Sequence, residues 1–230
     1  MKRWKKTGKE KQRKEEQYLR KKEKAAAVLH ELSNLYPDAG CSLDFTDPLE
    51  LLVATQLAAQ CTDVRVNIVT KDLFKKYRTA EDYAGADLSE LEEDIKSTGF
   101  FRNKARNIKE CCLKLLKDYG GQVPDNMGDL LSLPGVGRKT ANVLLSTIFN
   151  KPGVIVDTHC TRLAGRIGLT TSENPGIIEK DLMKILPRKE WANFSHYLVY
   201  HGREICQARK PKCEICSILP YCDYGRKKLK

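Results

Sequence analysis

Apolar residues recur every three or four positions along most of the chain, a spacing that places them on one face of an α-helix. The pattern is clear over residues 25–36 and clearest over residues 101–119, where two glycines end it. We predict further helices over residues 47–60, 63–74, 81–84, 88–96, 138–149 and 158–168, from residue 175, and over residues 191–200. The one strand-like run, residues 154–156, is too short to form a sheet. The sequence therefore predicts an all-α protein.

Several of these helices carry a start signal, in which a short polar side chain stands just before the first helical residue. Asp47 and Asn174 each precede a proline, which is favoured at the first helical position. Asp63 and Asp157 also stand where such caps are expected. The chain contains no internal repeat and no Gly/Ser linker, and residues 150–153 are the best candidate for a domain boundary.

The composition is that of a globular protein, since hydrophobic residues make up 41% of the chain and charged residues 31%. No apolar run approaches the roughly 18 residues that a membrane span needs, so we expect no membrane association. The N-terminus is charged rather than apolar, which argues against a secretory signal. We therefore expect an intracellular protein whose nine cysteines are reduced thiols or metal ligands rather than disulfides.

The net charge of +11 arises at the two ends of the chain. Residues 1–24 hold 12 Lys and Arg against 4 Glu, and residues 223–230 hold 4 Lys and Arg against one Asp. Basic ends suit a polyanion such as DNA, but solubilising tails fit the charge equally well. We expect residues 1–24 to form a mobile basic extension, and the global charge does not decide the partner.

Four cysteines near the C-terminus have the spacing C-x6-C-x2-C-x5-C; they are Cys206, Cys213, Cys216 and Cys222. Four thiolates so close together can surround one metal centre. A [4Fe-4S] cluster is favoured over zinc, because zinc usually takes paired C-x2-C knuckles and one knuckle is present. The other five cysteines are expected to be small core residues.

Three basic residues, Arg209, Lys210 and Lys212, lie between the first two of these cysteines. A metal centre would fix the shape of this loop, so that it could present its charges to phosphates. An ordinary solvated loop is an equal alternative.

The sequence Leu-Pro-Gly-Val-Gly at residues 133–137 predicts a tight turn that leads into a helix. Gly135, Val136 and Gly137 can turn backbone amides outward at the positive end of that helix, and Arg138 follows at once. This arrangement suits the binding of one DNA phosphate, which does not depend on the base sequence of the DNA. Such a turn is most often a plain connection between two helices.

Lys139 and Asp157 are the candidate catalytic pair. We expect Lys139 in the first turn of its helix, where the helix dipole and Arg138 disfavour a second positive charge, and partial burial would disfavour it further. An uncharged amine is a nucleophile, and Asp157 could then serve as its anionic partner. Taken singly, Lys139 is equally explained as a solvated lysine, and Asp157 as a helix cap with no catalytic role.

Three stretches together resemble the endonuclease III family of base-excision DNA glycosylases, within the helix-hairpin-helix superfamily. These are residues 133–142 (LPGVGRKTAN), residues 156–159 (VDTH) and the four-cysteine spacing. Supporting matches are residues 60–63 (QCTD), 99–105 (GFFRNKA) and 201–203 (HGR). The resemblance covers roughly residues 25–222.

The resemblance implies a helix-hairpin-helix DNA glycosylase fold of two helical lobes that binds double-stranded DNA containing damaged bases or abasic sites. One lobe is a continuous six-helix barrel, here residues 41–151. The other joins residues 25–40 to residues 152–230 and carries a [4Fe-4S] cluster on its C-terminal loop.

It also implies a reaction on a nucleotide flipped out of the duplex, because chemistry at C1′ is not reachable inside the base stack. Lys139 would attack C1′, expel an oxidised or ring-saturated pyrimidine and form a Schiff base, after which β-elimination nicks the strand. Asp157 would assist the proton transfers. Gln60 would fill the gap left by the flipped nucleotide, and Phe100 would wedge against the opposite strand.

Two departures from the family pattern concern this site. Phe100 stands where family members often carry leucine, and Ala58 replaces a serine that is common just ahead of Gln60. One alternative is a monofunctional adenine or mismatch glycosylase of the same fold, and another is a non-catalytic DNA-binding iron-sulfur module. The monofunctional enzymes lack a lysine at the position of Lys139, and a non-catalytic module would have lost Lys139 or Asp157, whereas this chain has both residues. We expect a monomer, located in the cytoplasm at the nucleoid of a prokaryote, or in the nucleus or mitochondrion of a eukaryote.

Overall fold

The structure is a computed structural model that describes residues 8–230, within which every regular element is helical. Residues 154–156, the strand-like run, join no sheet there; instead Val154 and Ile155 are buried, and the Ile155 amide donates to Ser195 Oγ at 2.9 Å. The chain divides into two compact units. Unit 1 combines the N-terminal segment up to Gly40 with Val154–Lys230, and unit 2 is Cys41–Gly153.

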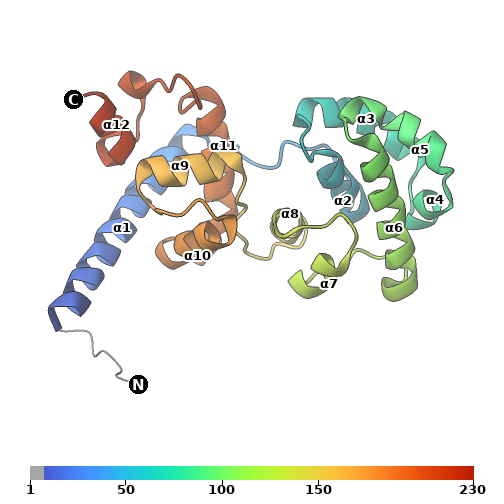
Figure 1. Ribbon diagram of the computed structural model, residues 1–230, viewed down its shortest axis with the longest axis horizontal. Helices are drawn as coiled ribbons and strands as arrows, with labels where there is room; N and C mark the ends of the chain where they lie inside the picture. Colours follow the sequence, from blue (N-terminus) through green and yellow to red (C-terminus); the bar gives the residue numbers. More distant parts are fainter. Residues whose placement is uncertain (1–7) are drawn as a thin grey trace. The chain divides into compact units, whose positions relative to one another are not determined.

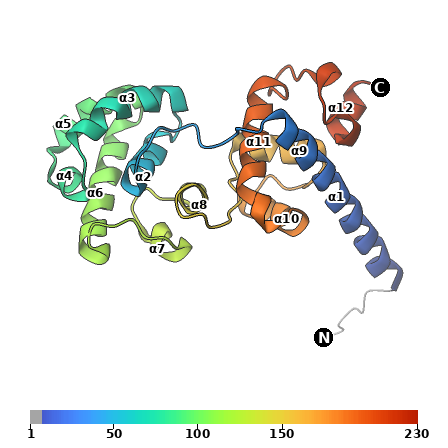
Figure 2. The same cartoon turned by 180° about the vertical axis from the view of Figure 1, so that it is seen from behind.

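Unit 1 combines the long helix α1 (Gly8–Leu35) with helices from the other end of the chain (Figures 1 and 2). These are α9 (Thr158–Ile167), α10 (Pro175–Ile185), α11 (Trp191–Glu204) and α12 (Asp223–Lys228), with short 3-10 turns η2 (Arg188–Glu190), η3 (Cys213–Ile215) and η4 (Leu219–Tyr221). Its core includes the fully buried side chains of Val28, Leu32, Leu163, Ile178, Leu182, Phe194 and Leu198. The two segments of unit 1 therefore share one hydrophobic core.

The basic extension is helical over residues 8–24, because this stretch is the first part of α1. Side chains at residues 10–20 are exposed, and both views show this end of α1 running out beyond the other helices of unit 1 (Figures 1 and 2). Lys24 anchors the helix where it reaches the unit, since its Nζ bonds to Asp223 Oδ1 at 2.7 Å and to the Ile167 carbonyl at 3.1 Å. The part of the expected mobile extension at residues 1–7 lies outside the described residues.

Unit 2 contains seven α-helices, one more than the resemblance implied. They are α2 (Pro48–Leu57), α3 (Asp63–Lys76), α4 (Ala80–Gly85), α5 (Leu88–Asp94), α6 (Phe101–Tyr119), α7 (Met127–Ser132) and α8 (Arg138–Thr147), with the 3-10 turn η1 (Lys96–Thr98) between α5 and α6. Helix α6 is central and packs against α4, α5 and α2. The additional helix is α7, which is six residues long and has one buried residue, Leu130.

The helix starts agree with the sequence at three of four positions. The side chains of Asp47, Asn174 and Asp157 accept hydrogen bonds from the first amides of α2, α10 and α9. The prediction for Asp63 was wrong: Thr62 caps α3, and Asp63 is its first residue. Helix α2 also ends at Leu57 rather than near residue 60, because the chain turns there and reaches Gln60 at φ 54°.

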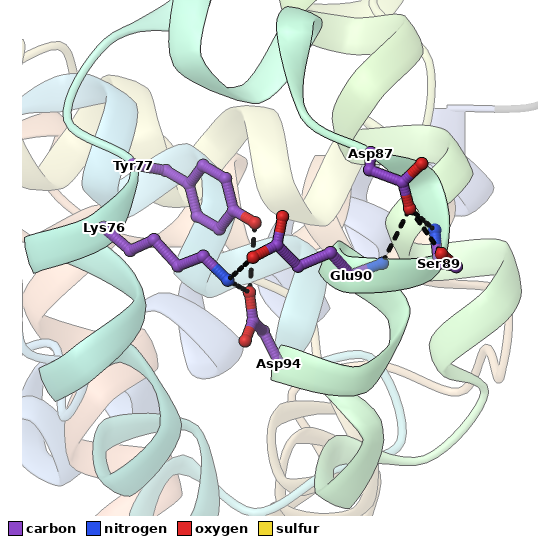
Figure 3. A network of polar contacts seen from close by, with 6 residues as sticks. All are labelled: Lys76, Tyr77, Asp87, Ser89, Glu90 and Asp94. Atoms are coloured by element: carbon purple, nitrogen blue, oxygen red, sulfur yellow. Dashed lines mark hydrogen bonds and ion pairs between the residues drawn. The ribbon is translucent and has the colours of Figure 1, made fainter.

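A polar network joins the end of α3 to α5 (Figure 3). Lys76 Nζ lies 2.8 Å from Glu90 Oε1 and 2.5 Å from Asp94 Oδ2, and the Tyr77 hydroxyl donates to the same Asp94 oxygen at 3.0 Å. Asp87 caps α5 through the Glu90 amide at 3.1 Å. Because α5 leads directly into η1, this network also fixes the start of the segment that reaches α6.

The shared core of unit 1 can be tested on α1. Leu32 is fully buried, whereas Leu35 on the same helix is 47% exposed. We expect Leu32→Ala to lower the free energy of unfolding by about 2–5 kcal/mol, because it removes buried methyl groups and leaves a cavity. Leu35→Ala is the matched control and should change it by less than about 0.5 kcal/mol. Urea unfolding followed by Trp191 fluorescence measures both, and equal effects would show that α1 does not share this core.

Candidate functional site

The turn between α7 and α8 presents a helix start that no side chain caps. The Val136 amide donates to the Leu133 carbonyl at 3.1 Å, and Gly135 has φ +75°, which favours glycine. Gln56 on α2 supports the turn, since its Nε2 donates to the Pro134 carbonyl at 3.3 Å. The positive end of the α8 dipole therefore lies at this turn, where it favours an anion.

Gly135 has no room for a side chain. A Cβ atom there would lie 2.9 Å from Gln56 Oε1 and 3.0 Å from Asn107 Cβ. Gly137 differs, because its φ is −95° and a Cβ atom would meet nothing within 4 Å. The turn thus needs glycine at residue 135 for both conformation and space.

Arg138 and Lys139 occupy the first turn of α8, and both side chains are exposed. Lys139 is not partly buried, because the buried stretch of α8 begins only at Ala141. Burial raises the pKa of the nearby Cys41 thiol, and the positive charge of Lys139 partly opposes this shift. Lys139 is thus an accessible amine beside an uncapped helix start.

Gln60 and Phe100, the two residues expected to enter the duplex, line one pocket together with Gly135. The pocket is open to solvent, and the space in and around it that no atom fills is about 600 Å³. Both residues have left-handed backbone conformations, with φ 54° and φ 50°, which residues other than glycine adopt only at a cost. Phe100 is 63% exposed, so a large apolar side chain stands in solvent at the edge of this pocket.

Asp157 lies in unit 1 as the N-cap of α9, and its Oδ1 accepts a hydrogen bond from the Cys160 amide at 2.7 Å. The carboxylate is half-buried. Burial lowers the pKa of the neighbouring His196, and the charge of Asp157 partly opposes that shift. Asp157 is therefore both a helix cap and a local negative charge.

The four cysteines of the C-terminal motif line one pocket in unit 1. Within the described residues, no three His, Cys, Asp or Glu side chains converge on a single point that would hold one metal ion. The rest of the lining is mostly apolar and includes Leu163, Ile167, Ile205, Pro211, Ile218 and Leu219. Four thiols around an apolar pocket fit the donor set of an iron-sulfur cluster.

Hydrogen-bond donors reach three of these sulfur atoms. Arg166 Nη1 lies 3.4 Å from Cys206 Sγ, and the Gly225 amide lies 3.4 Å from Cys222 Sγ. His201 Nε2 lies 3.4 Å from the third sulfur, that of Cys216. Such donors stabilise thiolates and orient them.

His201 is fully buried, and burial lowers its pKa to about 4, so its ring is neutral at pH 7. The Tyr36 hydroxyl lies 3.2 Å from its Nδ1. A neutral ring that accepts from Tyr36 at Nδ1 can donate from Nε2 to Cys216. Sequence reasoning noted the motif around His201 but did not identify this role.

The loop between Cys206 and Cys213 is held from two other helices. Arg166 donates to the carbonyls of Gln207 and Ala208 at 2.8 and 2.7 Å, and Lys228 donates to the carbonyl of Pro211 at 3.2 Å. The cations Arg209, Lys210 and Lys212 are all exposed on this loop. The positively charged side chains expected on this loop are therefore exposed from a backbone that hydrogen bonds hold in place. The roles of Arg166 and Lys228 in holding it were not predicted from the sequence.

Comparisons with known proteins agree with this geometry. The sequence profile of HhH-GPD superfamily base excision DNA repair proteins matches residues 53–188, and that of the iron-sulfur binding domain of endonuclease III matches residues 206–222. Endonuclease III of Synechocystis sp. is 53% identical over 203 residues, which cover 88% of this chain and 93% of the relative.

Solved structures give the same result. A trapped endonuclease III–DNA covalent intermediate superposes with a TM-score of 0.87 at 46% identity and covers 91% of this chain and 99% of its own. A thermostable thymine-DNA glycosylase superposes with a TM-score of 0.80 at 28% identity and covers 89% and 98%.

The fold and the site define a helix-hairpin-helix base excision repair enzyme with an iron-sulfur domain. The chain belongs to the endonuclease III family. It is accordingly a DNA-binding glycosylase with AP (apurinic/apyrimidinic) lyase activity, and its cofactor is a [4Fe-4S] cluster. Among residues 8–230, no helix is both long enough and apolar enough to cross a membrane.

The two glycines of the turn give a matched pair of variants. We expect Gly135→Ala to lower the free energy of unfolding by about 1–3 kcal/mol, because alanine is strained at this φ and lacks space. Affinity for duplex DNA should fall as well, since the turn must shift. Gly137→Ala should change stability by less than about 0.5 kcal/mol. Urea unfolding and DNA titration at fixed salt measure these effects, and the expectation fails if the two variants behave alike.

Proposed function

We propose that this enzyme removes oxidised pyrimidines from duplex DNA and then cleaves the strand at the abasic site, with Lys139 as the nucleophile. The observation that carries the proposal is the exposed amine of Lys139 on the first turn of the uncapped helix α8. At this position the amine lies beside the positive end of the helix dipole, where a DNA phosphate would be held. The same uncapped amides can hold a phosphate next to the nucleotide under attack.

The proposed reaction runs in two parts. Lys139 Nζ bonds to C1′ while the bond from C1′ to the base breaks, and the base leaves with a proton. The sugar ring then opens to a Schiff base. Loss of a proton from C2′ expels the 3′ phosphate by β-elimination, and water hydrolyses the Schiff base to release the enzyme.

In our proposal, Asp157 supplies the negative charge that these reaction steps need. Its carboxylate stabilises positive charge that develops on the sugar and accepts or returns protons around Lys139. One of its oxygens stays bonded to the Cys160 amide, so the cap holds the carboxylate in one orientation.

We propose that Gln60 and Phe100 hold the duplex open while the damaged nucleotide is flipped out. Removing a base from the stack costs a few kcal/mol, and side chains that occupy the gap recover part of this cost. Both residues are exposed at one pocket, and an exposed phenylalanine is otherwise unfavourable. The polar amide of Gln60 suits the gap, whereas the ring of Phe100 suits stacking against the opposite strand.

The DNA backbone is bound at two places in this proposal. Gly135, Val136, Gly137 and Arg138 bind one phosphate through the turn, while Arg209, Lys210 and Lys212 bind others from the cysteine loop. Cys206, Cys213, Cys216 and Cys222 hold the [4Fe-4S] cluster, which supplies a rigid centre for that loop. The enzyme acts as a monomer wherever the cell keeps its DNA, at the nucleoid of a prokaryote or in the nucleus or mitochondrion of a eukaryote.

The nucleophile is tested with Lys139→Gln. We expect this variant to bind duplex DNA within about threefold of wild type, because the turn amides remain, and to lose lyase activity by at least about a thousandfold. Borohydride trapping on duplexes that contain thymine glycol or an abasic site measures the Schiff base, with undamaged DNA as the control. Wild type should form an adduct with both damaged duplexes.

Two other outcomes would change the proposal. An adduct on the abasic duplex alone would retain the lyase and exclude thymine glycol as a substrate. Absence of any wild-type adduct, with the cluster intact and DNA bound, would favour a monofunctional glycosylase. A thymine-DNA glycosylase is among the similar structures, so this alternative has a specific observation behind it.

Asp157 is tested with a pair of variants that separate its charge from its capping role. Asparagine caps helices as well as aspartate, so Asp157→Asn should keep stability within about 0.5 kcal/mol, whereas Asp157→Ala should lose about 1 kcal/mol. We expect both variants to slow base release by at least about a hundredfold, because both remove the charge. Single-turnover rates and urea unfolding measure the two effects. If Asp157→Asn reacts at the wild-type rate, Asp157 is only a cap.

A further inference from the structure

Lys104 is a buried lysine for which the proposed reaction gives no role. It is 5% exposed and lies in the fourth position of α6. Its Nζ donates to the Leu57 carbonyl at 2.7 Å and to the Thr98 carbonyl at 2.8 Å. Burial lowers its pKa, and the two partners are backbone oxygens rather than carboxylates. A buried lysine of this kind costs stability, so its position calls for an explanation.

The two carbonyls belong to the segments that carry the two residues proposed to enter DNA. Leu57 is the last residue of α2, three residues before Gln60. Thr98 is the last residue of η1, two residues before Phe100. Carbonyls at helix ends lack partners within the helix, and a lysine side chain satisfies them.

Lys104 also reaches Phe100 through its own backbone. The Lys104 amide donates to the Phe100 carbonyl at 3.1 Å, which is the first helical hydrogen bond of α6. The lysine side chain lines the same pocket as Gln60 and Phe100. One residue thus bonds to both segments and lines the same pocket as the two exposed side chains.

Both acceptor segments are themselves well fixed. Leu57 is fully buried, and Thr98 is 2% exposed with its hydroxyl donating to the Ile95 carbonyl at 2.8 Å. The Lys76 network of Figure 3 holds α5, which precedes η1. The bonds of Lys104 therefore connect two rigid segments, and they fix the positions of the strained residues that follow.

We propose that Lys104 is a positioning residue, which holds Gln60 and Phe100 at a fixed separation so that both enter the duplex together when a nucleotide is flipped out. This inference rests on the proposed roles of Gln60 and Phe100. Without Lys104 the two segments would still fold against the core. Their exposed residues Gln60 and Phe100, which we call the tips, would however not be held at a fixed distance from each other.

The test is a double-mutant cycle on DNA discrimination. Lys104→Met keeps an unbranched side chain that is one atom shorter and removes its donors, and the Gln60→Ala/Phe100→Ala variant removes the side chains of the two tips, Gln60 and Phe100. The readout is the ratio of Kd values for an undamaged duplex and for a duplex with a tetrahydrofuran abasic analogue, which the enzyme cannot cleave. We expect Lys104→Met to lower this ratio about tenfold in the wild-type background and less than twofold in the background without tips.

Lys109 provides the matched control. It lies on the same helix, is half-buried, and donates through Nζ to the carbonyl of Ala86, which is distant in sequence from both tips. Lys109→Met should leave the ratio within twofold of wild type. Should Lys104→Met fail to fold, Lys104→Gln keeps one donor on a shorter side chain and should lower the ratio by a smaller amount with the same dependence on the tips.

The outcomes separate this inference from the proposed function. If removal of the tips lowers the ratio, but Lys104→Met has no effect or has the same effect with and without the tips, Lys104 is a structural residue and the inference is wrong. If removal of the tips leaves the ratio unchanged, the proposed roles of Gln60 and Phe100 are wrong, and the role of Lys104 falls with them.

Discussion

Backbone groups at helix ends lack hydrogen-bond partners within the helix, and the site in unit 2 is assembled from such ends. The carbonyls of Leu57 and Thr98 at the ends of α2 and η1 bond to Lys104, which fills this need from inside the fold. The start of α8 differs, because its N-cap residue is Gly137 and makes no side-chain cap hydrogen bond. The supporting helix ends are thus satisfied from inside the fold, whereas the helix end proposed to bind DNA is not capped by a side chain.

Unit 1 has a different structural role: it holds four thiols around one pocket and exposes positively charged side chains beside it. Apolar side chains such as Leu163 and Ile218 line the pocket, and donors from Arg166 and His201 reach two of the sulfur atoms. Arg166 also bonds to the loop carbonyls, so one side chain serves both the cysteine and the loop. The cations of the loop are then presented from a backbone that the rest of the unit holds in place.

The sequence predicts most of this fold because its long helices have strong periodicity and recognisable caps. The range predicted for α6 agrees with the structure, and the cap at Asp157 is confirmed. Helix α7 was missed because six residues with one buried leucine give no periodic signal, although Asn126 caps it through the Asp129 amide. The assignments of Lys139, Asp157 and the four cysteines are still predictions about chemistry, since the structure shows their surroundings and not the reaction.

The roles of the supporting residues could not be predicted from the sequence, for a physical reason. Lys104 and Arg166 both bond to backbone carbonyls, and a carbonyl acceptor has no signature in the amino-acid sequence. The exposure of Lys139 could not be predicted for a related reason, because the position along α8 at which burial begins depends on its packing partners. Sequence patterns identify residues by side-chain type, whereas these contacts depend on where the main chain passes.

The energetic character of unit 2 supports a functional reading of its pocket. Gln60 and Phe100 are held in an unfavourable backbone conformation, and Lys104 is a lysine removed from water. Each feature costs stability, and all three line the same pocket. Asn150 has a similar φ of 51° but lies elsewhere, before the chain leaves unit 2. Backbone strain alone therefore does not identify the functional site. The site is identified by the presence of backbone strain, a buried lysine and an exposed aromatic ring at one pocket. Selection for stability alone would not place these three costly features together.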